Sequence, residues 1–227
     1  MVPKCLVIIP DGNRRWARKN HRRDITGHTR GLFNCRSITR AAFERGVTHV
    51  VLWAASELNL YRRPPNEIMH IFRLLKHELR SRLKNPEEIG FHLCGDWRRF
   101  TQDQELFMLA DEVQEKSARY TKQQLTVLFG YSGRAELVDA IKKLSASGDE
   151  ITPETIRRHL WTSHLPDVDL VIRTGVQNDP HWSDWLLLWQ CGNSQLYFSA
   201  KDWPAFGVED LQAAFEDYAR RPRREGA

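Results

Sequence analysis

An aspartate followed by several arginines lies close to the start of the chain. The apolar run Leu6–Ile9 leads through a proline into Asp11, Gly12 and Asn13, and the basic segment Arg14–Lys19 follows. A glycine lets the backbone approach a ligand closely, and both arginine side chains and the N–H groups at the start of a helix bind phosphate. The pattern predicts a phosphate-binding turn at the end of a strand.

Asp11 sets the chemistry expected of this turn. Its carboxylate would repel a bound phosphate unless a cation lay between the two groups, and Mg²⁺ is commonly held by one or two carboxylates together with phosphate oxygens. The pattern therefore predicts a Mg²⁺ site at Asp11. The same residues also fit a tight turn capped by an aspartate and followed by a solvated basic helix, so the local pattern leaves both interpretations open.

Further polar groups follow other apolar runs of the sequence. Ser56 and Asn59, with Arg63 after them, follow one run, Gly130–Arg134 follows another, and Arg173 closes a third. Ligands of parallel α/β sheets bind at the carboxyl ends of strands, so we expect these groups to converge with the first turn. Arginines gathered around an acid favour a diphosphate site over a nucleic-acid surface, which is typically a basic stripe with exposed aromatic residues.

The segments that position these groups alternate between short apolar runs and longer helix-period stretches. The predicted strands are Cys5–Ile9, Val47–Ala54, Ile89–Cys94, Leu125–Gly130, Val168–Ile172 and Leu196–Phe198. The predicted helices are Arg30–Arg45, Glu67–Leu83, Gln104–Thr121, Arg134–Ser145, Thr152–His159 and Val208–Arg221. This alternation is typical of an α/β fold with a central parallel sheet flanked by helices. We expect one domain over residues 1–227, with 220–227 as a loose basic tail.

Composition narrows the function classes without choosing among them. The 34 lysines and arginines exceed the 29 acidic residues, for a net charge of +5, and a 41% hydrophobic content suffices for a sizeable core. Such a surplus suits a phosphate-bearing small molecule, an acidic membrane surface or nucleic acid. The cysteines show no metal-binding spacing, and no apolar run reaches the ~18 residues that span a bilayer. We expect a soluble cytoplasmic protein with reduced thiols, and peripheral contact with a membrane stays open.

Ordered motifs along the chain carry a family resemblance. They are Asp11–Ala17 (D-G-N-R-R-W-A), Gly27–Gly31 (G-H-T-R-G), Ser56–Ile68 with its S-x-x-N and R-P-x-x-E-I parts, Gly95–Phe100, Phe129–Arg134 and Asp169–Thr174. In these motifs the chain resembles the cis-prenyltransferase family, the undecaprenyl diphosphate synthase-like enzymes, over nearly its whole length. The resemblance implies an enzyme that breaks the carbon–oxygen bond of an allylic prenyl diphosphate with the help of Mg²⁺.

The resemblance also implies where the donor substrate binds. Its diphosphate would lie on Gly12, Asn13, Arg14 and Arg15, with Arg63 near. The prenyl tail would occupy a hydrophobic tunnel beside the sheet, flanked by the two helices expected at 30–45 and 67–83. The family's assembly implies a homodimer.

Four side chains take catalytic roles by the same resemblance. Asp11 would carry Mg²⁺ and promote ionisation, and Ser56 and Asn59 would lie near the reacting carbons and help remove a proton. His28 is a candidate donor to the departing diphosphate, or else a structural histidine bonded to the backbone. Charge builds on the leaving diphosphate, and preorganised donors together with Mg²⁺ stabilise that charge.

The region expected to bind the second substrate departs from the family pattern. Between Arg173 and Trp189 the chain is longer, and the family's second arginine is absent; His181 lies nearest its place, and Ser183 matches a family serine. Gln195 stands where the family has a glutamate that helps to hold Mg²⁺. Losing one arginine–diphosphate contact weakens an anionic substrate by roughly ten- to a hundred-fold.

Two tryptophans, Trp182 and Trp185, add aromatic surface to this region. They fit either a core position or a flat apolar pocket, and on the second interpretation we expect a non-standard acceptor, a small aromatic molecule. One alternative is cis elongation of a prenyl chain with isopentenyl diphosphate. Another is a non-catalytic subunit of a prenyltransferase complex, which the intact donor residues disfavour.

Overall fold

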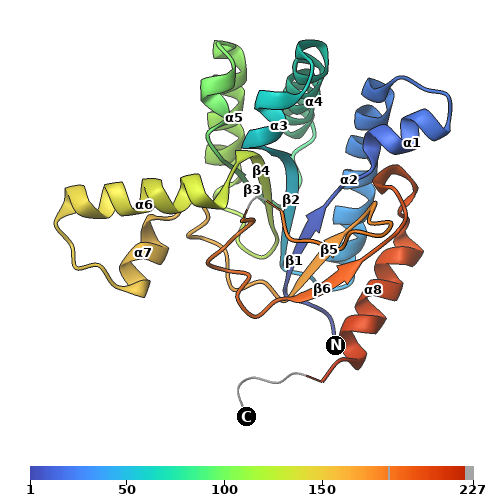
Figure 1. The fold of residues 1–227 in the computed structure, drawn as a ribbon. Coiled ribbons are helices and arrows are strands. Elements are labelled where there is room, and N and C mark those ends of the chain that lie inside the picture. The colour runs from blue at the N-terminus through green and yellow to red at the C-terminus, as the bar shows by residue number, and fades with distance from the viewer. Residues whose placement is uncertain (184, 223–227) are drawn as a thin grey trace.

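The computed structural model describes residues 1–183 and 185–222 of the chain, drawn in Figure 1. In this part of the chain six strands form one sheet in the order β3-β4-β2-β1-β5-β6, and all neighbouring strands are parallel. The strands are β1 (Cys5–Ile9), β2 (His49–Ser56), β3 (Gly90–Cys94), β4 (Gln124–Tyr131), β5 (Leu170–Arg173) and β6 (Gln195–Phe198). The predicted α/β fold with a central parallel sheet is confirmed.

Helices connect the strands. They are α1 (Asn13–Lys19), α2 (Asp24–Glu44), α3 (Glu57–Arg62), α4 (Pro65–Lys84), α5 (Gln104–Ser117), α6 (Gly133–Ser147), α7 (Pro153–His159) and α8 (Val208–Arg220), with short 3₁₀ turns η1 (Trp97–Phe100) and η2 (Trp203–Ala205). The sequence did not predict α3 or the earlier start of α2. The longer α2 places the Gly27–Gly31 motif on a helix beside α1.

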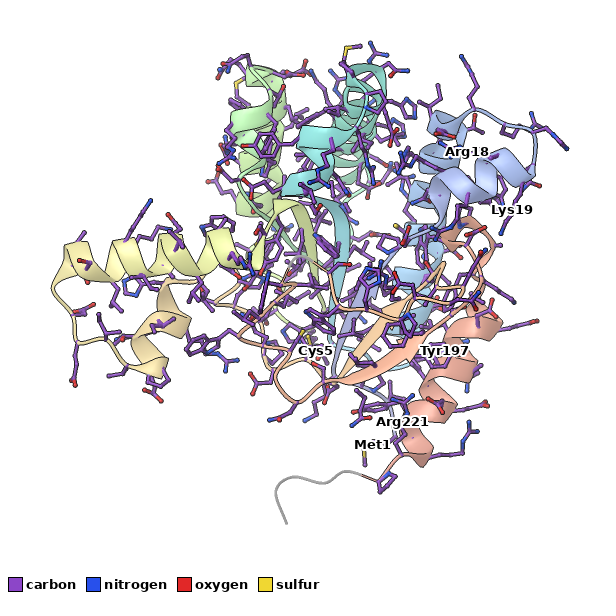
Figure 2. The ribbon with its side chains drawn as sticks, viewed as in Figure 1. Met1, Cys5, Arg18, Lys19, Tyr197 and Arg221 are labelled. Atoms are coloured by element: carbon purple, nitrogen blue, oxygen red, sulfur yellow. The ribbon has the colours of Figure 1, made fainter. Side chains whose placement is uncertain are left out.

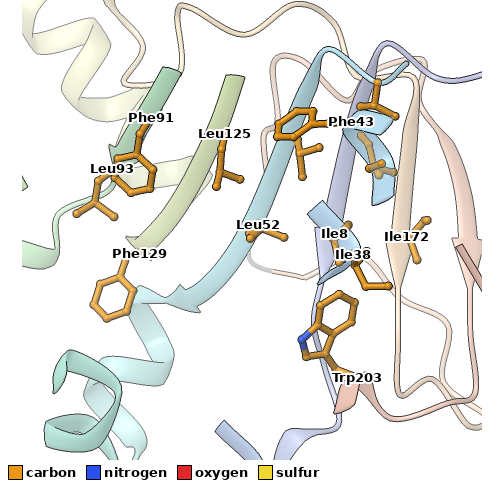
Figure 3. Close-up of a cluster of buried hydrophobic side chains, with 14 of the residues drawn as sticks. Ile8, Ile38, Phe43, Leu52, Phe91, Leu93, Leu125, Phe129, Ile172 and Trp203 are labelled. Atoms are coloured by element: carbon orange, nitrogen blue, oxygen red, sulfur yellow. The ribbon is translucent and has the colours of Figure 1, made fainter. Parts of the chain in front are cut away.

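The two faces of the sheet are covered differently. On one face, alternate strand residues such as Ile8, Leu52 and Phe91 pack against α2, α4, α5 and α8 in one large cluster of buried side chains, part of which Figure 3 shows. On the other face, Val7 and Val51 pack against irregular segments around Leu165 and Leu187. The helical hairpin of α6 and α7 extends away from the sheet (Figure 1). Burial on both faces explains the nearly continuous apolar strands.

An apolar cavity of about 440 Å³ lies between α2, α4 and the first sheet face. Leu32 and Phe43 of α2, Leu75 of α4, and Leu52 and Val127 of the sheet are among its lining residues. Its volume lies within the ordinary range for small-molecule sites, about 300–1,000 Å³. The two helices that flank it are those expected to flank a prenyl chain.

The two ends of the sheet carry different parts of the chain. Arg18 and Lys19 of α1 lie beyond the carboxyl ends of the strands, whereas Met1 and Arg221 lie near the opposite end (Figure 2).

The start of the predicted loose tail is in fact anchored: Arg221 pairs with Asp217 at the end of α8 and donates to the Leu196 carbonyl oxygen. Residues 223–227 of that tail lie outside the described residues. The extent of the single domain stays a prediction.

The four cysteines are free in the structure: Cys5 and Cys94 are buried, and Cys35 and Cys191 are half-buried. Burial raises the pKa of the Cys35 and Cys191 thiols to about 12, so both are protonated at neutral pH. Among the described residues, no helix is both long and apolar enough to cross a membrane.

The packing of α4 gives a first test. Leu79 is fully buried in the large cluster, so Leu79→Ala leaves a cavity and is expected to lower the free energy of unfolding by about 2–5 kcal/mol in urea denaturation. Met69 lies on the same helix with its side chain exposed, and Met69→Ala should change the value by less than about 0.5 kcal/mol. Equal effects of the two substitutions would contradict this packing.

Candidate active site

A polar cavity of about 690 Å³ lies at the carboxyl ends of β1, β2 and β5. Every predicted site residue except Trp185 and Gln195 lines it: Asp11, Gly12, Asn13, Arg14, Arg15, His28, Ser56, Asn59, Arg63, Arg173, His181, Trp182 and Ser183. Arg18, Trp53 and Leu58 also line it, and no role was predicted for them from the sequence. The expected convergence at one edge of the sheet is therefore observed for these residues, whereas Gly130–Arg134, also expected here, does not line the cavity.

The polar cavity adjoins the apolar cavity beside α2. Pro10, Asn13, His28 and Ala54 line both. One ligand could therefore place a charged group among the arginines and an apolar chain between α2 and α4.

Asp11 occupies the centre of the polar cavity. Its Oδ1 accepts a hydrogen bond from the Gly12 N–H at 2.6 Å and lies 3.5 Å from the Arg15 guanidinium. Its Oδ2 lies 3.3 Å from Nη2 of Arg173, the last residue of β5. About 39% of the Asp11 side chain is exposed, so the carboxylate is oriented by cations yet remains open to a ligand.

A second carboxylate, Asp202, holds α1 against the site and was not predicted. Its buried side chain accepts from Arg15 Nε at 3.2 Å and from Lys19 Nζ at 2.9 Å. Gly12 packs against it with φ of 101°, and a Cβ added to Gly12 would lie 2.8 Å from the Asp202 Cα. Only glycine therefore fits position 12 without displacing backbone.

A third carboxylate, Glu67 of α4, is buried beneath the cavity. Its Oε1 lies 2.9 Å from His28 Nε2 and 3.4 Å from Arg63 Nε, and its Oε2 lies 3.9 Å from Arg14. Glu67 thus orients three of the predicted site residues at once. Glu67 belongs to one of the sequence motifs, but no role was predicted for it, because its burial is not visible in the motif.

His28 is neutral at neutral pH. Burial lowers its pKa, the charge of Arg63 lowers it further, and the bond to Glu67 only partly opposes these effects. Because a carboxylate accepts hydrogen bonds, Nε2 carries the ring proton and Nδ1 of the neutral ring is an acceptor. The structure thus gives His28 a side-chain partner, Glu67, in place of the backbone partner considered from the sequence.

Ser56 and Asn59 form the capping box of α3. The Asn59 N–H donates to Ser56 Oγ at 3.1 Å, and the Ser56 N–H donates to Asn59 Oδ1 at 3.4 Å. Asn59 Oδ1 also accepts from Arg63 at 3.0 Å. These two residues therefore fix the turn after β2 and orient Arg63, which is a structural contribution to the site.

Arg173 is occupied by the segment that follows it. Its Nη1 donates to the His181 carbonyl oxygen at 2.8 Å and to Ser183 Oγ at 2.6 Å. The His181 ring lies against Asp179 instead, 3.0 Å from that carboxylate. His181 thus contributes its backbone at this point, and its ring does not take the place of an arginine fork.

Trp185 lies apart from the cavity, contrary to expectation. Its ring stacks under the Arg134 guanidinium, 4.4 Å from the ring centroid, and its backbone lies against Gly133. Trp182 does line the cavity, as does Trp53 of β2. The flat pocket expected from Trp182 and Trp185 is therefore not formed.

Gln195 lies at the opposite end of the sheet from Asp11. It begins β6 and pairs in register with Leu170 at the start of β5, and its Oε1 accepts a hydrogen bond from Arg221. Within one chain, Gln195 therefore does not reach the site. Sequence spacing could not show this, because the position depends on strand register.

One carboxylate of the site is open to a metal ion. No cluster of three or more His, Cys, Asp or Glu side chains suited to a metal occurs among the described residues. Asp11 alone cannot complete the coordination of Mg²⁺, but a carboxylate together with diphosphate oxygens can. The donor set therefore fits an ion that is bound jointly with a phosphorylated substrate.

Comparison with known proteins decides the family. The family model described as putative undecaprenyl diphosphate synthase matches residues 9–226. The chain belongs to this prenyltransferase family. It is 38% identical to an isoprenyl transferase of Zymomonas mobilis, with 99% of this chain and 92% of the relative covered. It is 35% identical to one of Aquifex pyrophilus, with 99% and 96% covered.

Solved structures agree with this assignment. Lavandulyl diphosphate synthase from Lavandula x intermedia, in complex with dimethylallyl diphosphate, is similar with a TM-score of 0.90 and 29% identity, over 100% of this chain and 99% of that one. A probable undecaprenyl diphosphate synthase from Campylobacter jejuni gives a TM-score of 0.80 and 26% identity, over 100% of both chains. The protein is a prenyltransferase enzyme.

The buried carboxylate gives the prediction for this site. Glu67→Gln keeps the side-chain shape but leaves Arg63 and Arg14 without their buried counter-charge, so we expect the free energy of unfolding to fall by about 1–3 kcal/mol at neutral pH. Urea denaturation measures this. The matched control is Glu112→Gln, which removes an exposed pair with Lys116 and should cost less than about 1 kcal/mol. An unchanged stability of Glu67→Gln would contradict the buried role.

Proposed function

We propose that this prenyltransferase ionises a short allylic prenyl diphosphate in the polar cavity and joins its prenyl group to a second isoprenoid diphosphate. The observation that carries the proposal is the junction of the two cavities at Pro10, Asn13, His28 and Ala54. An allylic diphosphate has the matching shape, with an anionic head and an apolar chain.

Arginines bind the head of the donor. Arg14 is the least engaged of them, with its nearest carboxylate oxygen 3.9 Å away, and Arg15 is 42% exposed beside Asp11. Arg63 is held by Asn59 and Glu67 with its charge facing the same cavity. Fork-shaped guanidinium groups bind phosphate oxygens in pairs, so these side chains fix the diphosphate while the prenyl chain enters the space beside α2.

Ionisation breaks the bond between the allylic carbon and the bridging oxygen, and the electron pair leaves with the diphosphate. Mg²⁺ held between Asp11 and the diphosphate would supply positive charge to the leaving group. Arg15 and Arg63 stabilise the same developing charge without having to move, because their carboxylate partners already hold them, and Arg14 adds its charge from the same cavity. The double bond of the acceptor then attacks the allylic carbon and forms a carbon–carbon bond, and the resulting cation loses a proton to the released diphosphate, a base in the same cavity.

His28 takes a different role from the one expected. A neutral ring that donates Nε2–H to Glu67 has no second proton to give to a departing diphosphate. We infer that His28 orients the site through Glu67 and offers Nδ1 as an acceptor. Ser56 and Asn59 support Arg63 and border the same cavity.

The acceptor follows from the chemistry of the relatives' products. The donor loses its diphosphate in the reaction, so a product that is itself a diphosphate must take that group from the acceptor. Two structural relatives are named for such products, lavandulyl and undecaprenyl diphosphate. This favours an isoprenoid diphosphate acceptor, the elongation alternative or a branched variant of it, over the small aromatic acceptor expected from the sequence.

The aromatic acceptor keeps one observation in its favour. Trp182 and Trp53 line the polar cavity, and Arg173 is bound by the chain's own His181 carbonyl and Ser183. Trp185, however, lies elsewhere, which removes half of the surface on which that hypothesis depended.

The metal site gives one prediction. Asp11→Asn should lower kcat about a hundred-fold or more, because the amide keeps the shape but loses the charge that would hold Mg²⁺ against the donor. EDTA should stop the wild-type reaction, and added Mg²⁺ should restore it. Asp111→Asn, in which an exposed surface aspartate is neutralised, is the control and should retain activity. Near wild-type turnover of Asp11→Asn would show that the assigned role is wrong.

The acceptor gives a second prediction. We expect dimethylallyl diphosphate to react with isopentenyl diphosphate or with a second dimethylallyl diphosphate, giving a product that mass spectrometry identifies as a diphosphate. A dihydroxynaphthalene tested in parallel should give little product. Efficient prenylation of the naphthalene, with no isoprenoid diphosphate formed, would overturn the acceptor class while leaving the donor chemistry intact.

The expected homodimer remains a proposal. β6 is an edge strand, and its Leu196 and Phe198 side chains are 36% and 38% exposed. An apolar sheet edge is commonly covered in the native assembly. We expect a dimer in sedimentation equilibrium at micromolar concentration. A monomer under these conditions would contradict the assembly, though not the chemistry.

A further inference from the structure

Charged side chains form part of the wall in the far half of the apolar cavity, beside apolar residues such as Phe43 and Leu125. Near the polar cavity its wall is made by residues such as Leu32 and Cys35, but farther along α2 and α4 the wall includes Arg36, Glu78 and Arg82. Glu78 joins the two helices: its Oε2 accepts from Arg36 Nε at 2.7 Å, and its Oε1 lies 3.0 Å from Arg82 Nε. Glu78 and Arg82 are each less than one-fifth exposed.

Further contacts extend this network of Arg36, Glu78 and Arg82 to the sheet and to the segment after α4. The Arg82 guanidinium lies 5.0 Å from the centroid of the Phe91 ring of β3. Glu87, which follows α4, lies 3.9 Å from Arg82 and 3.6 Å from Arg40. The charged side chains thus connect α2, α4 and the sheet around one end of the cavity.

Polar atoms in the same part of the cavity lack partners. Arg36 Nη2 and Thr39 Oγ1 are buried and have no hydrogen-bond partner in the described part of the chain. Both residues line the cavity. An alkyl chain can offer such a group no hydrogen bond, so this part of the wall binds an alkyl chain less well than a wall of apolar side chains would.

We propose that the Arg36–Glu78–Arg82 network, together with Thr39, interrupts the apolar wall of the prenyl-binding cavity and limits the isoprenoid chain to about ten to fifteen carbons. The inference rests on the proposed function and deepens it by setting the size of the substrate and product. A hydrocarbon chain gains binding energy from each apolar contact and loses binding energy where it covers the polar side chains of the network.

The length follows from helix geometry. His28, at the junction of the cavities, and Arg36 are eight residues apart on α2, which corresponds to about 12 Å at 1.5 Å per residue. Thr39 lies about one turn farther, or roughly 16 Å from His28. An extended isoprene unit has four main-chain bonds and spans roughly 5 Å, so two to three units reach the network.

The test replaces the whole network at once. The variant Arg36→Met, Glu78→Leu, Arg82→Met leaves no unpaired charge among these three residues, and apolar replacements of buried ion pairs are often neutral or stabilising. Its control is Arg80→Met with Glu105→Leu, which removes an exposed pair on the outer side of α4. Thr39→Val is the second variant. It removes one unpartnered hydroxyl and keeps the network, so the proposal can still be tested if the triple variant does not fold.

Binding of prenyl alcohols with ten, fifteen and twenty carbons isolates the cavity from the diphosphate chemistry. For the wild type and the control we expect affinity to rise up to about fifteen carbons and then to fall at twenty. In the triple variant the twenty-carbon alcohol should gain about ten-fold or more relative to the ten-carbon alcohol, and in Thr39→Val about five-fold. The same length dependence in wild type and both variants would overturn the inference.

Product analysis adds an independent readout. With dimethylallyl and isopentenyl diphosphates, the wild type should stop at fifteen carbons or fewer and the triple variant should extend beyond that length. Wild-type products of thirty carbons or more would overturn the inference. A length cut-off for the alcohols that shifts in the variants, with no turnover of any isoprenoid acceptor, would support the cavity limit while refuting the proposed acceptor.

Discussion

The site depends on how positive charges are held together around an open cavity. Arg14, Arg15, Arg63 and Arg173 repel one another, and this repulsion would spread them apart if no fixed negative charge opposed it. Three carboxylates provide this fixed negative charge. Asp11 lies at the centre, and the buried Asp202 and Glu67 hold the surrounding cations from behind.

The fold supplies those carboxylates from distant parts of the chain. Asp11 follows β1, Glu67 lies in the first turn of α4, and Asp202 precedes η2. The parallel sheet brings the first and last of these together, because β5 runs beside β1, β6 runs beside β5, and all three end at the same edge. Glu67 reaches the same place because α2 and α4 lie side by side, tied by the His28 and Arg36 contacts. A substrate anion therefore meets charges that are already arranged, which is the condition for electrostatic stabilisation of a leaving group.

The sequence predicted the strands well and the loops poorly, for physical reasons. A strand buried on both faces leaves a run of apolar residues, so Cys5–Ile9 was identified from its composition. α3 is short and polar and is defined by the Ser56 cap, which carries no periodic signal. The motif residues around Asp11 converge as predicted because strand ends meet at one edge. The predictions that Trp185 and Gln195 lie in the site were wrong. Trp185 lies in a loop whose backbone has positive φ and points its side chain elsewhere, and strand register places Gln195 at the end of the sheet opposite Asp11.

The central claim is that one allylic diphosphate spans both cavities, and a crystal structure with Mg²⁺ and an unreactive thio analogue of dimethylallyl diphosphate tests it most directly. We predict density for the diphosphate against Arg14, Arg15 and Arg63, with the metal between it and Asp11, and the five-carbon chain pointing past His28 toward the space between α2 and α4. A diphosphate bound away from Asp11, or a prenyl chain directed out of the apolar cavity, would contradict the claim.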